Sequence, residues 1–203
     1  MTQVNIDAVK TLREMTGAGM MDCKNSLQEA GGDIDKAVVL LRERGIAKAA
    51  KKIGRETSNG VIEAYLHRTG DYPPQTGALV EVNCESDFVA KGEDFRALAR
   101  ELALHITAAA PRWINRDEVP ADLIQAESEL FRRTAEQDGK PAGAIEKIVS
   151  GQVEAFYKQN VLMDQVYVRD AKVTIKDLIA ANIGRLGENI TVRRFSRFNI
   201  KEA

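Results

Sequence analysis

Apolar residues recur at helical spacing through the first fifty residues. Three short segments follow one another, and their apolar faces consist of Ile6, Val9 and Leu12; Met20, Cys23, Leu27 and Ala30; and Ile34, Val38 and Leu41. Asn5 and Asp33 are suited to cap the first and third segments, and Gly45 indicates the end of the third. Each segment is too short to be a stable helix alone in water. The pattern therefore predicts a three-helix bundle of about 45 residues, near the lower limit for an independent domain.

The turn after the first segment reads Thr16-Gly17-Ala18-Gly19. A phosphate-binding loop would follow a strand and end in Gly-Lys-Ser/Thr, so this turn is interpreted as a tight helix–helix connection with a positive φ angle. Met20 and Met21 follow it, and both cannot face one narrow apolar stripe. We expect one of them to be exposed beside the turn, and partner binding and core packing both remain open for this pair.

The period changes to that of β-strands after Gly60. Ile62, Ala64 and Leu66 alternate with polar or aromatic positions up to His67, and a second alternating run carries Val80, Val82 and Cys84. A turn-rich segment, residues 69–77, separates the two runs. The pattern predicts a β-hairpin with one buried apolar face, with Cys84 pointing inward and His67 outward.

Helical periodicity returns for most of the remaining chain. Helices are expected from Phe95 to Pro111, from Pro120 to about Gly139, over residues 144–159, and from Thr174 to a stop at Gly184; a final strand is expected over residues 189–198. His105 borders the first of these helices and is interpreted as a hydrogen-bonded structural histidine.

The overall prediction is an α+β fold. A three-helix bundle and basic linker form residues 1–54, and an α+β core with a small antiparallel sheet forms residues 55–203.

Composition narrows the function classes. The chain has 203 residues, and its 29 Lys and Arg are balanced by 30 Asp and Glu. This balance argues against nucleic-acid binding through positive charge spread over the whole chain. It contains no run of about 18 apolar residues, and its start lacks the pattern of a signal peptide. Two cysteines and two histidines give poor support for a disulfide scaffold or a metal site. No nucleophile elbow, kinase motif set or HExxH motif occurs, so no enzyme class is indicated.

Two features admit more than one interpretation. The basic stretch over residues 42–55 is typical of a solvated linker helix, and a nucleic-acid or membrane patch is the alternative. Phe88 lies between the second strand and the next helix and belongs to neither pattern. Spacing alone favours packing of Phe88 back onto the domain over insertion into a partner, because exposing phenylalanine forfeits about 1.5–3 kcal/mol of burial. Asp87 could cap this turn or meet a basic partner.

Four long motifs occur in one order along the chain. They are Thr16–Lys24 with Gly32-Asp33 and Leu41-Arg42; Glu81–Ala90; Leu162–Gln165; and Gly187–Ile190 before Val192–Phe195. Together they resemble the signatures of the bacterial elongation factor Ts family and extend over nearly the whole chain. Departures are small, since Ser86 replaces a more usual threonine, Ser26 an alanine and Val166 a frequent proline. The length resembles the compact form of the family, which lacks an inserted coiled coil.

The resemblance implies a guanine-nucleotide exchange factor that promotes GDP release from elongation factor Tu in the cytoplasm. It implies that Ser86, Asp87, Phe88 and Val89 push into the partner and disturb its Mg²⁺ site, and that an N-terminal domain of ubiquitin-associated type docks through Lys10, Arg13 and Met20. Insertion into a partner thereby becomes the expected role of Phe88. The resemblance also implies that the chain is not an enzyme, needs no metal or other cofactor, and binds no nucleotide of its own.

Assembly and two rival functions complete the expectations. The arginine-rich last strand, with Arg193, Arg194 and Arg197, can pair with a second copy at a sheet edge, so we expect a homodimer. The rivals are a ubiquitin-type adaptor, based on the three-helix start, and an RNA-binding adaptor using residues 48–55 and 193–197. No membrane or nucleic-acid partner is required by the family resemblance.

Overall fold

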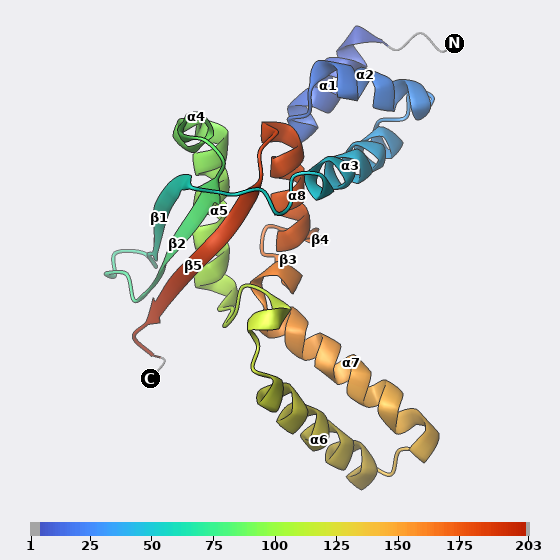
Figure 1. Ribbon diagram of the computed structural model, residues 1–203, viewed down its shortest axis with the longest axis vertical. Helices are drawn as coiled ribbons and strands as arrows, with labels where there is room; N and C mark the ends of the chain where they lie inside the picture. The colour runs from blue at the N-terminus through green and yellow to red at the C-terminus, as the bar shows by residue number, and fades with distance from the viewer. Residues whose placement is uncertain (1–4, 202–203) are drawn as a thin grey trace. The chain divides into compact units, whose positions relative to one another are not determined.

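The computed structural model describes residues 5–201, which form helices and a small sheet (Figure 1). The helices are α1 (Ile6–Thr16), α2 (Met20–Glu29), α3 (Ile34–Ala50), α4 (Asp87–Lys91), α5 (Glu93–Ala109), α6 (Ala121–Gln137), α7 (Ala142–Asn160) and α8 (Ile175–Leu186), with 3-10 turns η1 (Arg116–Glu118) and η2 (Leu162–Asp164). The strands are β1 (Asn59–His67), β2 (Thr76–Cys84), β3 (Val166–Tyr167), β4 (Asp170–Thr174) and β5 (Ile190–Asn199). The predicted α+β fold class is confirmed.

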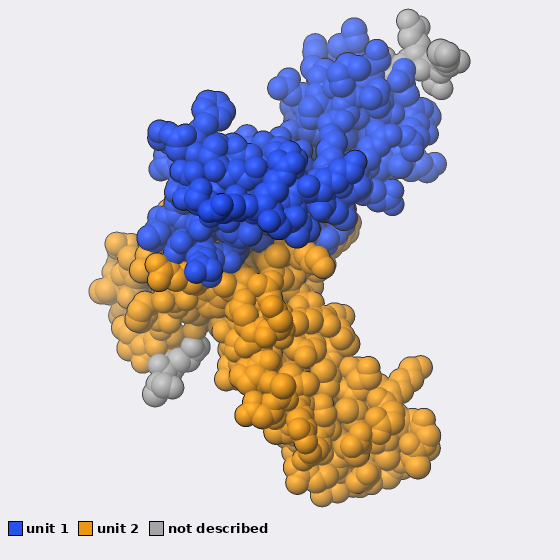
Figure 2. All heavy atoms as spheres, in the orientation of Figure 1, with its two compact units in different colours: residues 1–62, 81–99, 177–193 blue, residues 63–80, 100–176, 194–203 orange. Residues whose placement is uncertain are grey.

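The chain divides into two compact units, which Figure 2 colours separately. Unit 1 comprises residues 1–62, 81–99 and 177–193, and unit 2 comprises residues 63–80, 100–176 and 194–203. Unit 1 therefore contains the N-terminal helices, α4 and most of α8. Unit 2 contains α6, α7 and the β3–β4 hairpin.

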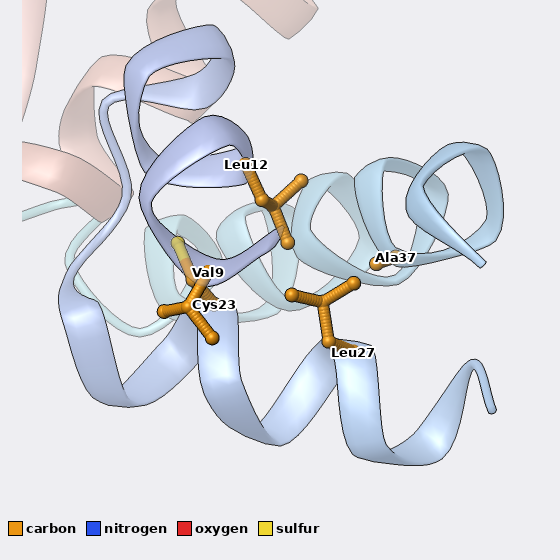
Figure 3. Packing of buried hydrophobic residues seen from close by; sticks show 5 residues of the cluster. All are labelled: Val9, Leu12, Cys23, Leu27 and Ala37. Atoms are coloured by element: carbon orange, nitrogen blue, oxygen red, sulfur yellow. The ribbon is translucent and has the colours of Figure 1, made fainter. Parts of the chain in front are cut away.

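The N-terminal bundle has both predicted caps and most of the predicted core, but the predicted apolar positions Ile6 and Met20 are exposed. Its buried cluster consists of Val9, Leu12, Cys23, Leu27 and Ala37, which point toward one another from α1, α2 and α3 (Figure 3). The Asn5 side chain accepts a hydrogen bond from the Asp7 N–H at 3.0 Å, and the Asp33 side chain accepts one from the Lys36 N–H at 3.1 Å. Gly17 ends α1 with a φ of 66°, as the interpretation of the turn required.

Two predicted helix ends are wrong, and both errors involve glycine. Helix α3 continues through Gly45 to Ala50, and α8 continues through Gly184 to Leu186. A Cβ atom on Gly184 would lie 3.0 Å from the Gly45 Cα, so these two glycines allow the backbones of α3 and α8 to approach closely. Each glycine thus serves helix packing within unit 1, whereas local propensity treats it as a stop signal.

The sheet has the strand order β1-β2-β5, so the last strand returns to the hairpin as predicted. A Cβ atom on Gly60 would meet the Val82 carbonyl, and one on Gly77 would meet the Tyr65 carbonyl, which shows that β1 and β2 run antiparallel. Val80, Val82 and Cys84 are buried, as their alternation predicts. The sheet therefore has β2 at its centre and β1 and β5 at its edges.

The predicted burial of β1 is wrong. Ile62 and Leu66 are 69% and 62% exposed and Ala64 is also exposed, whereas Glu63 and Tyr65 are half-buried. The alternation correctly identified two faces. However, the apolar face of this edge strand is the one that the monomer leaves uncovered, so periodicity alone assigned the wrong face to the core. His67 is exposed, as predicted.

Helices α6 and α7 form the predicted helical pair, and Gly139 lies in the turn between them with a φ of 68°. The β3–β4 hairpin was not predicted. It pairs Val166 with Thr174 and Tyr167 with Asp170, and a two-residue strand is too short to show an alternating pattern.

His105 is fully buried in unit 2 and is hydrogen-bonded, which confirms its structural interpretation. Its Nδ1 accepts a hydrogen bond from the Val168 N–H at 3.3 Å, so its Nε2–H donates to the Gln165 side-chain oxygen at 2.9 Å. Gln165 in turn donates to the Gln159 carbonyl at 2.7 Å. Burial lowers the pKa of His105, although the bond to Gln165 opposes that shift. The neutral imidazole thereby joins α5 to the β3–β4 hairpin.

The lowered pKa predicts acid sensitivity of folding. Because the folded-state pKa of His105 lies below the unfolded value of about 6.5, the free energy of unfolding should fall as pH decreases through that value. Urea unfolding at pH 7.5 and 5.5 measures this difference. His105→Gln should reduce the pH dependence, and His67→Gln, which replaces the exposed histidine, should retain it. Equal pH dependence in His105→Gln and the unmodified chain would contradict the prediction.

Candidate functional site

A single helical turn follows β2 and contains the residues Ser86 to Val89. Ser86 has an extended backbone and caps α4, because its Oγ accepts a hydrogen bond from the Val89 N–H at 3.3 Å. Val89 and Ala90 are buried and anchor the turn on unit 1, and Gly92 ends it before α5 begins. A helix of five residues cannot be stable by itself, so its orientation depends on these contacts.

Phe88 points away from the protein and is 83% exposed. The spacing-based prediction that Phe88 packs back onto the domain is therefore wrong. One turn of helix can bury only one side, and Val89 and Ala90 occupy it. An aromatic side chain presented by an anchored turn is typical of a residue that fills a pocket in a partner.

Asp87 lies beside Phe88 and forms an exposed ion pair with Lys91, at 2.7 Å. The hydrogen bond and charge of Lys91 lower the pKa of Asp87, so its carboxylate is ionised at neutral pH. Ser86, and not Asp87, caps the turn. The exposed surface of α4 thus combines an aromatic ring with a carboxylate that remains accessible at its side.

Two glutamates from distant parts of the chain hold the start of this turn. The Glu188 Oε2 accepts hydrogen bonds from the Glu85 and Ser86 N–H groups at 3.1 and 3.0 Å, and its Oε1 accepts one from the Ser86 hydroxyl at 2.6 Å. In the opposite direction, the Glu85 Oε1 accepts a hydrogen bond from the Asn189 N–H at 2.6 Å. This bond, more than Arg55 nearby, lowers the pKa of Glu85. Sequence reasoning assigned no role to Glu188, because only the fold brings it to Ser86.

Cys84 lies under the same turn as a buried residue, as predicted. Its thiol is within hydrogen-bond distance of the Ser86 carbonyl, with the two atoms 3.2 Å apart. Burial, with a smaller contribution from the charge of Glu188, raises the pKa of Cys84 to about 11. The thiol is therefore protonated and packs as a small apolar group.

The second predicted set, Lys10, Arg13 and Met20, lies on the exposed sides of α1 and α2. Lys10 is 3.9 Å from Asp7 in an exposed pair. Both Met20 and Met21 are exposed, which exceeds the expectation that one of them would be. The bundle thus presents thioethers at the start of α2 and positively charged side chains along α1, and both predicted sets belong to unit 1.

Contacts with α8 fix this bundle within unit 1. Arg42 of α3 pairs with Asp177 of α8 at 2.5 Å, and the same two helices approach closely at Gly45 and Gly184. A Cβ atom on Gly17 would lie 3.1 Å from the Arg185 Cδ, so the first turn also lies against α8. These contacts place the N-terminal helices on the element that immediately precedes Glu188.

The basic stretch over residues 42–55 is largely engaged in intramolecular ion pairs. Arg42 pairs with Asp177, Arg44 with Glu29, Lys48 with Asp22, and Arg55 with Glu85. These carboxylates offset the charge that a nucleic-acid site would need, which supports the linker interpretation. Among residues 5–201, no helix is long and apolar enough to cross a membrane, and no three His, Cys, Asp or Glu side chains gather as a metal site.

Comparison with known proteins bears on the whole chain. The family model described as "Elongation factor TS" matches residues 3–200. The chain is 52% identical over 200 residues to the elongation factor Ts of Fervidobacterium nodosum, covering 98% of this chain and 100% of that protein. Its identity is also 52% over 195 residues to that of Caldanaerobacter subterraneus subsp. tengcongensis, covering 96% of each chain, and 51% over 197 residues to that of Herpetosiphon aurantiacus, covering 97% of this chain and 98% of that protein. With both compact units included in these matches, the chain belongs to the elongation factor Ts family.

Proposed function

We propose that this protein is a guanine-nucleotide exchange factor that binds elongation factor Tu·GDP and promotes GDP release during translation elongation in the cytoplasm. The observation that carries the proposal is the exposed Phe88 on an anchored turn, within the segment that resembles the family's intruding element. Membership of the elongation factor Ts family supports elongation factor Tu as the partner. The chain makes no covalent change in this role, and its own residues supply only binding energy.

The proposed mechanism is insertion of α4 next to the partner's Mg²⁺ site. Phe88 would enter a pocket, with Ser86, Asp87 and Val89 shaping and supporting the inserted surface. Mg²⁺ neutralises phosphate charge, so its displacement weakens the partner's hold on GDP. Accelerating release by ~10⁴ requires about 5.5 kcal/mol of preferential binding to the nucleotide-loosened state. Several contacts must share this free energy, and the N-terminal helices provide the second contact area.

Release of fluorescent GDP from elongation factor Tu, with and without this chain, tests the exchange function directly. Phe88→Ala should slow the catalysed release by about thirtyfold, because loss of a buried aromatic contact removes roughly 2 kcal/mol of transition-state stabilisation. Asp87→Ala should act in the same direction but more weakly. Thermal unfolding should change little in either variant, since both side chains are exposed.

Tyr72→Ala is the matched control, because Tyr72 is another exposed aromatic residue and lies outside the candidate site. It should leave the exchange rate unchanged. Absence of acceleration by the unmodified chain would overturn the proposed function. Normal exchange by Phe88→Ala would overturn the insertion mechanism alone.

In the proposed complex, residues 1–54 dock on elongation factor Tu, and residues 55–203 provide the α4 turn that inserts into it. Replacing Arg13 and Met20 together by alanine should weaken binding to elongation factor Tu about tenfold, since these side chains are exposed and contribute little to the bundle core. Isothermal titration calorimetry measures the dissociation constant, and Lys147→Ala on α7 is the control. Unchanged affinity in the Arg13 and Met20 double variant would assign the docking surface elsewhere.

We also propose a homodimer formed by the exposed apolar side of the sheet. Leu66, Leu79, Phe198 and Ile200 line one groove in unit 2 and are all exposed in the single chain. A second copy presents the same side chains in return, which gives a self-complementary apolar contact. Pairing along the free edge of β5 is the alternative mode of association.

Sedimentation at micromolar concentration should show a species of twice the 22.4 kDa chain mass. Phe198→Asp should convert it to monomer, because a carboxylate would be buried against an apolar partner. Leu130→Asp, at an exposed leucine on α6, should leave the dimer intact. A 22.4 kDa species from the unmodified chain would reject the dimer, and a stable Phe198→Asp dimer would reject the proposed face.

A further inference from the structure

The carboxylate of Glu188 is the only described group that binds both peptide N–H groups at the start of the α4 turn. The residue stands at the entry to β5, whereas the turn follows β2, so the fold joins two segments about a hundred positions apart. Its third bond, from the Ser86 hydroxyl, is the shortest at 2.6 Å. Glu188 therefore binds the backbone and the side chain of the residue that caps α4.

The three bonds require a carboxylate in this orientation. Both Glu188 oxygens act as acceptors, and ionised acceptors form stronger hydrogen bonds than neutral ones. A glutamine would retain one acceptor oxygen and turn an N–H₂ group toward a donor. Because the Ser86 hydroxyl proton is directed to Glu188, its oxygen lone pairs remain oriented toward the Val89 N–H. By orienting the Ser86 hydroxyl, Glu188 therefore also supports the hydrogen bond that caps the first turn of α4.

The return bond makes the connection reciprocal. Glu85 accepts from the Asn189 N–H at 2.6 Å, while the Asn59 side chain donates to the Glu85 carbonyl at 2.9 Å. Consecutive residues 85–86 and 188–189 therefore exchange hydrogen bonds in both directions. A turn held in this way has little freedom to rotate, so the direction in which Phe88 projects is fixed before any partner arrives.

We infer that Glu188 is a positioning residue for nucleotide exchange, which acts through Ser86 to hold Phe88 in the orientation needed for insertion. This inference rests on the proposed exchange function. Glu188 itself need not touch the partner. Its contribution is to reduce the conformational freedom that α4 would otherwise lose when it enters the GTPase.

The test compares Glu188→Gln with the unmodified chain in the release of fluorescent GDP from elongation factor Tu. We expect about a tenfold slower release at saturating concentration of this chain. Amide hydrogen exchange at Ser86 and Val89 should become faster in the free variant, because the bonds that protect these groups are weakened. Glu136→Gln, at an exposed glutamate on α6, should change neither measurement.

A double-mutant cycle separates positioning from general destabilisation. If Glu188 acts through Phe88, Glu188→Gln should slow exchange much less in a Phe88→Ala background than in the unmodified chain. Equal losses in both backgrounds would show that Glu188 acts independently of Phe88 and would overturn the inference. Unchanged exchange in Glu188→Gln would also overturn it, whereas failure of the unmodified chain to accelerate release would instead reject the exchange function.

Variants at Ser86 provide a second test that keeps the backbone bonds to Glu188. Ser86→Ala should slow exchange about threefold, because it removes both the link to Glu188 and the cap of α4. Ser86→Thr retains the hydroxyl and should restore the normal rate. If Glu188→Gln does not fold, a normal exchange rate in Ser86→Ala overturns the inference by itself.

Discussion

Hydrogen bonds exchanged between the turn after β2 and the turn before β5 determine how the candidate site is built. Glu188 binds the backbone of residues 85 and 86, and Glu85 binds the backbone of Asn189. On one side, this connection fixes the start of α4 and the projection of Phe88. On the other side it fixes the end of the segment that leaves α8, the helix against which α3 packs at Gly45 and Gly184. The two surfaces proposed to bind the partner are therefore supported by adjacent parts of one unit.

Periodicity was sufficient where a segment buries one face against its immediate neighbours. The core of the N-terminal bundle follows this rule, and so do Val80 and Val82 in β2. The rule failed at Gly45, where a local stop signal is overridden by a helix distant in sequence. It also failed at Ile62 and Leu66, because alternation distinguishes two faces of a strand without indicating which one the monomer covers.

In the candidate site, too, local sequence patterns predicted some features, whereas contacts between segments distant in sequence could not be predicted. Spacing identified Phe88 as a residue that fits neither neighbouring element, but it favoured packing against the domain. The motif resemblance pointed to exposure, which the structure shows. Glu188 lies within a motif that resembles the family, yet nothing in its own neighbourhood indicates Ser86 as its partner. Such a contact exists only once β5 has returned to β2, so no local pattern could predict it.

An exposed Phe88 has a thermodynamic consequence for the proposed exchange reaction. The free chain forgoes about 1.5–3 kcal/mol of burial at this residue, and insertion into a partner recovers it only in the complex. Binding equilibria are reciprocal, so a factor that loosens GDP must itself be loosened by GDP to the same extent. Phe88 should therefore contribute mainly to the nucleotide-loosened state, where its pocket is open. A rigid α4 is needed for this selectivity, because a mobile turn could withdraw Phe88 and bind the GDP-bound state equally well. Binding both states equally would strengthen the complex without shifting the nucleotide equilibrium.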